Sequence, residues 1–454
     1  MDAPRKSVFD VAAFLDGRSL NGFNYRIVVL SWLITVFDGL DLMMISFTAP
    51  YLKDEFGLSK TMLGDLFATG TAGQILGGFV LAYVADRMGR RPTIVVTSFL
   101  FGILTIATAF AANYPQLLLL RFFDGFAIGG MLPIAWALNI EFVPRRMRAT
   151  IVATIMLGYS IGSAAAGPIT NLVAPGHGWQ GVYVAGGLGT LVCAVLLLLG
   201  LPESIRFLTS KQRSPDKIVA LLRRLDTAAE ATAAHQFILG DERQAPKFHV
   251  RELFRGSLAI ITPLLWIGYL ASALAIFANS SWGPTLLEEL KVPRQTAALV
   301  ASAGGLLGSL AGLLLIRLTE RHGPRWIAFY PALAVPVLVL LGLGHTPQNA
   351  FLPFVILGTM LIGGGHAAII SIAGIYYPSA IRANGGGWAT SIAKFGGVIG
   401  PILAAALLSS GMPLLNAYAF LAICPAILCL SVLGIDAAVR RGRSVSAALA
   451  STPL

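Results

Sequence analysis

Two aspartates, Asp38 and Asp41, lie three residues apart in an apolar stretch at 28–51 that is long enough to cross a bilayer. An unpaired carboxylate in hydrocarbon costs roughly 2.5–3.5 kcal/mol. Residues at this spacing lie on nearly the same face of a helix, so we expect the pair to hold one proton near neutral pH. The pair therefore indicates proton uptake and release inside a membrane. The alternative is that one aspartate only pairs with a structural cation.

Three further ionisable side chains in apolar stretches are candidates for binding. Arg121 has Asp124 three residues further on, a spacing that suits a local ion pair as well as guanidinium binding of an anionic substrate. Lys394 has no acidic residue in its own stretch, which makes it the best single candidate for a substrate carboxylate; the alternative is a fixed salt bridge to another helix. His366, flanked by glycines, suits proton exchange, or is a hydrogen-bonded packing residue.

The composition predicts the elements that must position these groups. Hydrophobic residues make up 56% and charged residues 12% of the 454 residues, whereas soluble domains carry about 25% charged residues. The mean hydropathy is +0.75. We predict an all-α membrane protein with twelve transmembrane helices. The predicted helices cover 26–51, 61–84, 92–112, 116–140, 148–172, 181–201, 257–282, 296–316, 326–345, 351–375, 384–408 and 414–436.

The basic residues predict the orientation of these helices. With a cytoplasmic N-terminus, 27 of the 33 Lys and Arg residues fall in cytoplasmic segments and only four fall on the other side. Because positive charge accumulates on the cytoplasmic side, we expect both termini in the cytoplasm. The net charge of +11 then reflects topology and attraction to lipid headgroups, and no nucleic-acid partner is expected.

The chain contains an internal repeat. The loop motif that begins Asp86-Arg87 returns as Glu320-Arg321 at an offset of 234, and Pro144…Arg148 returns as Pro378…Arg382 at the same offset. Two matches at one offset predict pseudo-symmetric six-helix bundles at 1–201 and 256–454. Residues 202–255 between them read as a polar cytoplasmic linker, helical around 215–230.

Cofactor chemistry has no support in the sequence. Cys193, Cys424 and Cys429 lie in apolar helices without metal-ligand spacing, and no nucleotide-binding fingerprint occurs. We therefore expect no cofactor, no metal and no enzymatic activity.

Several motifs resemble one transporter family. The acid–Arg–x–Gly–basic loop at 86–90 is similar to the signature loop of the major facilitator superfamily. Asp38-Gly39-Leu40-Asp41 resembles the DGxD signature of its aromatic acid:H+ symporters, and the runs 121–125 and 377–383 are similar to that family as well. The resemblance covers residues 15–440 and implies the major facilitator fold, with two bundles that alternate access to a central site.

The resemblance also implies a function: proton-coupled import of a hydroxybenzoate-like or lignin-derived aromatic carboxylate across a bacterial inner membrane, by a monomer. In this reading Asp38, Asp41 and His366 couple protons, while Arg121, Lys394 and Asp124 bind the substrate. The predicted cytoplasmic gate comprises Asp86, Arg87, Gly89, Arg90, Glu141, Arg148, Glu320, Arg321 and Arg382.

The sequence departs from the family pattern and leaves rival functions open. Lys394 stands where many relatives carry arginine, and lysine lacks the bidentate fork. Pro324 replaces a basic residue in the second loop, so we expect ion pairs to hold this loop less strongly than the first. The rivals are a proton-driven efflux antiporter, a symporter for another organic acid or a sugar (the Leu201–Arg206 run occurs in sugar porters), and a sensor of aromatic compounds. A sugar requires no cation at mid-membrane.

Overall fold

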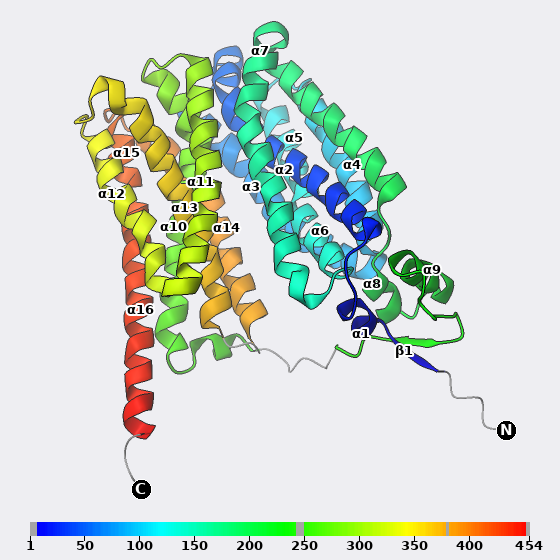
Figure 1. Cartoon of the computed structure of the whole chain (residues 1–454). Helices are drawn as coiled ribbons and strands as arrows, with labels where there is room; N and C mark the ends of the chain where they lie inside the picture. The colour runs from blue at the N-terminus through cyan, green and yellow to red at the C-terminus, as the bar shows by residue number, and fades with distance from the viewer. Residues whose placement is uncertain (1–6, 242–248, 378–380, 451–454) are drawn as a thin grey trace, which may run out of the picture. The chain divides into compact units, whose positions relative to one another are not determined.

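The computed structural model of the chain describes residues 7–241, 249–377 and 381–450, and these are almost wholly helical (Figure 1). In hydrocarbon a helix satisfies its own backbone hydrogen bonds, so the apolar stretches become helices. The helices of the apolar stretches are α2 (Gly22–Phe56), α3 (Lys60–Met88), α4 (Arg90–Thr108), α5 (Tyr114–Gly129), α6 (Met131–Ile140), α7 (Arg148–Gly200), α10 (Leu258–Glu289), α11 (Arg294–His322), α12 (Phe329–Gly342), α13 (Phe351–Tyr376), α14 (Arg382–Ser409), α15 (Asn416–Leu421) and α16 (Ile423–Ala450). The shorter elements are β1 (Val8–Asp10), α1 (Val11–Asp16), α8 (Ile205–Ser210), α9 (Pro215–Leu225) and β2 (Gln236–Ile238).

The spans account for the twelve predicted crossings. Within the described residues, 11 helical segments are long and apolar enough to cross a membrane. One of them contains α7, whose 53 residues measure roughly 80 Å at 1.5 Å per residue, more than twice the thickness of a bilayer core. Gly178, at φ 66°, interrupts its helical backbone. The predicted helices at 148–172 and 181–201 are therefore the two arms of α7, and twelve crossings result.

The chain forms two compact units. The first comprises residues 1–41, 72–162 and 180–246, and the second comprises 42–71, 163–179 and 247–454. The predicted bundles at 1–201 and 256–454 follow the chain order instead, and that division stays a prediction. In the first unit α4 packs against α5 and α6, and the core includes Ile34, Phe101, Leu138 and Leu197, each buried.

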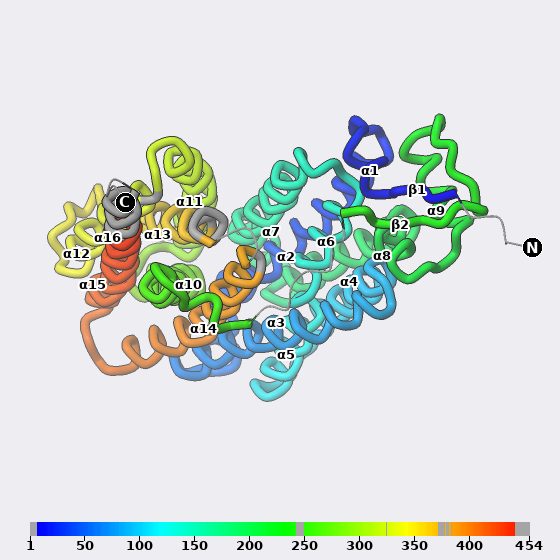
Figure 2. Tube along the Cα trace, turned by 90° about the horizontal axis from the view of Figure 1, so that it is seen from below, coloured from blue at the N-terminus to red at the C-terminus, as the bar shows by residue number. Residues whose placement is uncertain are grey.

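A cap subdomain, made of β1, α1, α8, α9 and β2, belongs to the first unit (Figure 2). β1 pairs in parallel with β2, with Val8 opposite Gln236. Asp10 caps α1 and also accepts a hydrogen bond from the backbone of Gly240. The helix predicted around 215–230 is α9, and the strand pair is a short addition of three residues per strand to an otherwise helical fold. Apolar residues of the cap, such as Leu15 and Leu222, join the core of the unit.

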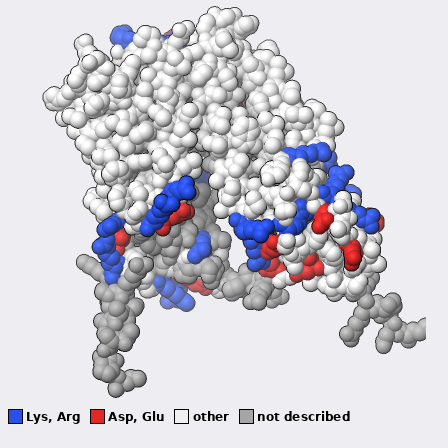
Figure 3. Space-filling view, in the orientation of Figure 1, with Lys and Arg blue, Asp and Glu red and all other residues white. Residues whose placement is uncertain are grey.

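Charge and apolar surface are separated within this unit. Lys, Arg, Asp and Glu gather at the end that carries the cap (Figure 3), where Arg145, Arg206 and Asp241 form ion pairs. The helix flanks expose large apolar side chains instead, for example Leu199 at 74%. Such exposure suits contact with lipid chains rather than water.

In the second unit α10 packs against α14 and α16, and α11 packs against α13. The repeat is visible in the backbone of the two loops. Gly89 in the first unit and Gly323 in the second, 234 positions apart, have φ values of 117° and 97°. Only glycine adopts such values without strain, which explains why both copies of the loop motif retain it.

Candidate proton and substrate sites

The predicted carboxylates and Arg121 meet in the first unit. Asp38 and Asp41 lie on α2, and Arg121 and Asp124 lie on α5. All four residues are buried, with exposed fractions between 0% and 3%. The predicted face of the first helix therefore lies in the interior of the unit, against α5.

Arg121 contacts two aspartates at once. Its Nη1 lies 3.1 Å from Oδ2 of Asp41 and 2.6 Å from Oδ2 of Asp124. The local ion pair with Asp124 and the contact between helices are thus both present. Both use the same nitrogen, and the Nε of Arg121 has no hydrogen-bond partner among the described residues. The guanidinium does not bind either carboxylate through a two-nitrogen fork.

Asp38 is left without a partner among the described residues. Neither of its carboxyl oxygens accepts or donates a hydrogen bond within the described part of the chain, although the side chain is fully buried. The cluster thus contains three carboxyl groups and one guanidinium. Because a buried charge without compensation is costly and is avoided by taking up a proton, the cluster can bind and release protons.

Close helix contacts position this cluster. A Cβ added at Gly73 of α3 would overlap the backbone oxygen of Phe122, one residue from Arg121. A Cβ added at Gly162 of α7 would overlap the backbone oxygen of Val36, two residues before Asp38. Thr105 of α4 donates a hydrogen bond to Asp124 at 3.2 Å. Thr105 was not among the predicted site residues, and its only signal in the sequence is a hydroxyl in an apolar stretch.

Two predicted residues, His366 and Lys394, belong to the second unit. His366 on α13 lies with its Nδ1 3.0 Å from the hydroxyl of Ser272 on α10. This contact makes it a hydrogen-bonded histidine, and a neutral imidazole can take part in it. Lys394 on α14 is half-buried and forms no ion pair with any described residue. The fixed salt bridge considered for Lys394 is therefore not seen in the described part of the chain.

The predicted gate residues of the first unit form a connected network. Arg90 lies 3.1 Å from Asp86 and 3.3 Å from Glu141, and Ser204 donates a hydrogen bond to Glu141. Burial raises the pKa of Glu141, and Arg90 and Ser204 oppose that rise. Arg90 therefore ties the loop after α3 to the end of α6.

Other gate residues contribute less. Arg87 stacks over the ring of Tyr83, with 4.5 Å between the guanidinium carbon and the ring centroid. Arg148 forms no ion pair within the described residues, and its Nε has no hydrogen-bond partner there. In the second unit Glu320 and Arg321 are exposed and unpaired among the described residues, while Arg382 donates to the backbone of Tyr377. Pro378 lies outside the described residues.

Glu203 was not among the predicted gate residues, although it contacts the gate. Its Oε1 accepts hydrogen bonds from the backbone nitrogens of Arg90 at 2.9 Å and Arg91 at 3.2 Å. It thereby caps the start of α4, where the positive end of the helix favours a carboxylate. Glu203 stands in the Leu201–Arg206 run, but nothing in that run shows which backbone nitrogens it contacts.

A second set of ion pairs lies at the C-terminal end of α10, within the second unit. Glu289 lies 2.7 Å from Lys53 and 3.0 Å from Lys60. Arg294 contacts Glu288 and Asp54, at 2.5 Å and 2.9 Å. In the sequence, Lys53, Lys60 and Arg294 indicate only the topology, because nothing there shows which acidic residues face them.

Comparison with known proteins identifies the family. The model of the Major Facilitator Superfamily matches residues 31–401 and 265–447. The chain belongs to this superfamily. The transporter is 30% identical over 410 residues to the 4-hydroxybenzoate transporter PcaK of Pseudomonas aeruginosa, covering 90% of this chain and 91% of the relative. It is 31% identical over 415 residues to the gallate transporter of Pseudomonas putida, covering 91% of each.

Solved structures show the same fold. The transporter superposes on a bacterial homologue of the human lysosomal transporter Spinster with a TM-score of 0.71 and 17% identity, covering 93% and 98% of the two chains. It superposes on a D-xylose–proton symporter with the same TM-score and identity, covering 91% and 97%. The predicted twelve-helix facilitator fold is confirmed, and this chain is a multi-pass membrane transporter.

Proposed function

We propose that this transporter imports an aromatic carboxylate together with protons across a bacterial inner membrane. The names of its relatives, a 4-hydroxybenzoate and a gallate transporter, support an aromatic acid as substrate. The distribution of Lys and Arg supports cytoplasmic termini. The transporter acts as a monomer by alternating access, as in other facilitators built from two repeats.

The observation that carries proton coupling is the unpaired, fully buried carboxyl group of Asp38. Arg121 compensates one negative charge of Asp41 and Asp124, and Asp38 holds the transported proton. One proton that moves with one monoanion leaves the cycle electroneutral. A second proton would draw about 2.3 kcal/mol per 100 mV from the membrane potential.

Lys394 supplies the charge for the substrate. It is half-buried in a membrane helix and forms no ion pair with the described residues. Its positive charge is therefore available to pair with the carboxylate of a substrate. This favours an anionic substrate over a sugar. His366 takes the second proton-coupling role, through the imidazole that contacts Ser272.

The test of coupling is uptake into proteoliposomes with an imposed pH gradient. Labelled 4-hydroxybenzoate should accumulate with the gradient, and a protonophore should abolish the accumulation. Asp38→Asn should lose accumulation but keep exchange of labelled for unlabelled substrate. Asp65→Asn changes an exposed aspartate of α3 and serves as control. Gradient-driven accumulation by Asp38→Asn at the wild-type level would remove Asp38 from the coupling role.

The test of substrate binding uses Lys394→Met with Lys291→Met as the matched control, since Lys291 is exposed. We expect Lys394→Met to weaken 4-hydroxybenzoate binding at least tenfold, measured by thermal shift and by exchange. Equal binding by the two variants would contradict the proposal.

A further inference from the structure

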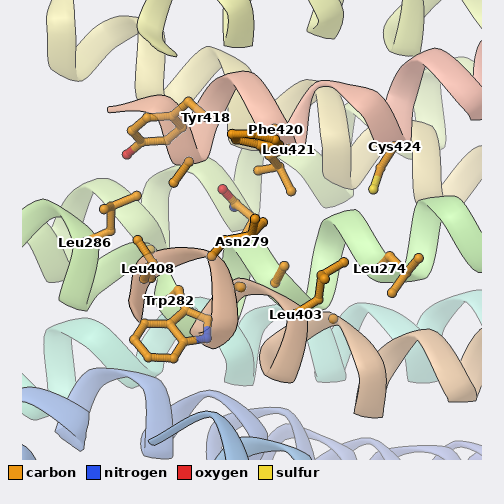
Figure 4. A pocket seen from close by; sticks show the side chains of 16 residues that line it. Leu274, Asn279, Trp282, Leu286, Leu403, Leu408, Tyr418, Phe420, Leu421 and Cys424 are labelled. Carbon is orange, nitrogen blue, oxygen red and sulfur yellow. The ribbon is translucent and has the colours of Figure 1, made fainter. Parts of the chain in front are cut away.

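A cavity lies inside the second unit, between α10, α14 and the segment formed by α15 and α16 (Figure 4). Leucines, alanines and aromatic rings line it, and no charged residue does. It contains neither Lys394 nor His366, so it is separate from the proposed transport residues. The lining selects for an apolar ligand without net charge.

The cavity is elongated. Figure 4 shows Tyr418 and Leu286 at one end and Leu274 and Cys424 at the other. Leu274 and Leu286 lie on the same helix, twelve positions apart, which is roughly 18 Å at 1.5 Å per residue. One leaflet of a bilayer core is about 15 Å thick, half of the whole. The cavity therefore has the length of one lipid acyl chain.

The rim of the cavity faces the membrane. Leu403 of α14 and Phe420 of α15 line the cavity and are 49% and 43% exposed. Exposed apolar residues on membrane-spanning helices contact lipid, so a ligand enters from the bilayer rather than from water.

One polar group at the end of the cavity lacks a partner. Tyr418 is 4% exposed, and its hydroxyl forms no hydrogen bond with any described residue. The other two donors in the lining are engaged: Asn279 donates to Thr359, and the indole of Trp282 donates to the backbone oxygen of Pro401. Tyr418 lies near the start of α15 and of the candidate span Asn416–Arg440, and tyrosines are common at the ends of spans, where they meet lipid headgroups. An ester carbonyl is the acceptor that a lipid presents at that depth.

We propose that this cavity binds one acyl chain of a phospholipid, whose ester carbonyl accepts a hydrogen bond from Tyr418. The chain fills the apolar length of the cavity, while the headgroup stays at the membrane surface. Because α10 carries Ser272, the partner of His366, and α14 carries Lys394, the bound lipid lies between two helices that hold proposed transport residues.

Gly283 provides a way to fill the cavity. It lines the cavity, and a Cβ added there would meet no atom within 4 Å. Gly283→Leu should therefore occupy the cavity without displacing the backbone. Gly305 on α11 also has open space and does not line the cavity, so Gly305→Leu is the matched control.

The first experiment titrates the purified full chain in detergent micelles with phosphatidylglycerol that carries bromine on its acyl chain. Bromine quenches nearby indoles, and the Trp282 signal is the difference between each protein and its Trp282→Phe counterpart. We expect saturable quenching of Trp282 in the wild type and in Gly305→Leu, and loss of at least half of it in Gly283→Leu. Unchanged quenching in Gly283→Leu would overturn the proposal.

The second experiment tests the hydrogen bond. Diether phosphatidylglycerol lacks the ester carbonyl, so the wild type should bind it roughly three- to tenfold more weakly than the diester lipid, the effect of one hydrogen bond. Tyr418→Phe should bind both lipids equally, at the level of the wild type with the diether. A preference for the diester that persists in Tyr418→Phe would show that a group other than Tyr418 recognises the ester carbonyl, and would contradict the proposal. Neither readout depends on transport.

Discussion

Arg121 lies 3.1 Å from the carboxylate of Asp41, although the two residues are 80 positions apart in the sequence. The contact joins α5 to α2 in the interior of the first unit. The contact also determines whether Asp38 has an ion-pair partner, because the guanidinium of Arg121 already contacts Asp41 and Asp124. Among the described residues, Asp38 is thereby left as the carboxyl group of the cluster without a counter-charge.

Removal of Arg121 should be strongly destabilising. Arg121→Met leaves the carboxylates of Asp41 and Asp124 buried without a cation, and breaking a buried pair from one side costs about 3–5 kcal/mol. The triple variant Arg121→Met, Asp41→Asn, Asp124→Asn should recover most of that loss. Thermal unfolding of the purified proteins measures it, with Arg317→Met, which removes an exposed arginine of α11, as control. A triple variant no more stable than Arg121→Met would argue against charge as the cause.

The ion pairs around Glu289 should contribute to transport. Lys53 of α2 and Lys60 of α3 both contact this residue of α10, so Glu289→Lys replaces two attractions with repulsions. Partly exposed pairs contribute about 0.2–1 kcal/mol each, and we expect a severalfold loss of uptake. The charge-swapped variant Lys53→Glu, Glu289→Lys should restore part of the activity. If the charge-swapped variant recovers no uptake, the ion pair between positions 53 and 289 is not the cause of the loss.

The cap subdomain should lose stability in acid. Arg206 and Arg145 hold the pKa of Asp241 at about 2, below its ordinary value of 3.8. The carboxylate therefore stabilises the folded state above about pH 4, and this contribution disappears as the pH falls through 2. The difference in thermal midpoint between wild type and Asp241→Asn should be constant from pH 5 to 7 and should shrink between pH 4 and 2. A difference that is independent of pH would contradict this assignment.

The close contact of α3 with α5 should not tolerate a methyl group. Gly73→Ala places a Cβ against the backbone oxygen of Phe122, and overpacking of this kind costs about 1–3 kcal/mol. The helix shift should also disturb Arg121 and reduce uptake. Gly305→Ala, at a glycine with open space, is the control for helix propensity. Equal thermal midpoints for the two variants would show that α3 and α5 separate at no cost.

The sequence predicted the transmembrane helices better than it predicted which side chains contact each other across helices. Apolar length and the distribution of basic residues are properties of the chain itself, so the twelve spans and the charged residues inside them were readable. The spacing of Arg121 and Asp124 predicted their ion pair for the same reason. The contact of Arg121 with Asp41 depends on how α2 and α5 pack, and neither spacing nor composition encodes that. Without it, Asp38 and Asp41 are indistinguishable.

Two other findings had no usable signal. β1 and β2 are three residues each and more than 200 positions apart, too short and too distant for alternation to reveal a strand pair. Glu203 caps α4 through backbone nitrogens, and such a contact depends on where the chain returns after α7.

The parallel pair of β1 and β2 has a consequence for biosynthesis. It joins residue 8 to residue 236, so both partners are available once the ribosome has passed the cap, before α10 is made. Multidomain chains generally fold from the N-terminus as they emerge. The strand pair then marks the point at which the newly made chain has everything needed to close its cap, while most of the second unit has yet to be synthesised.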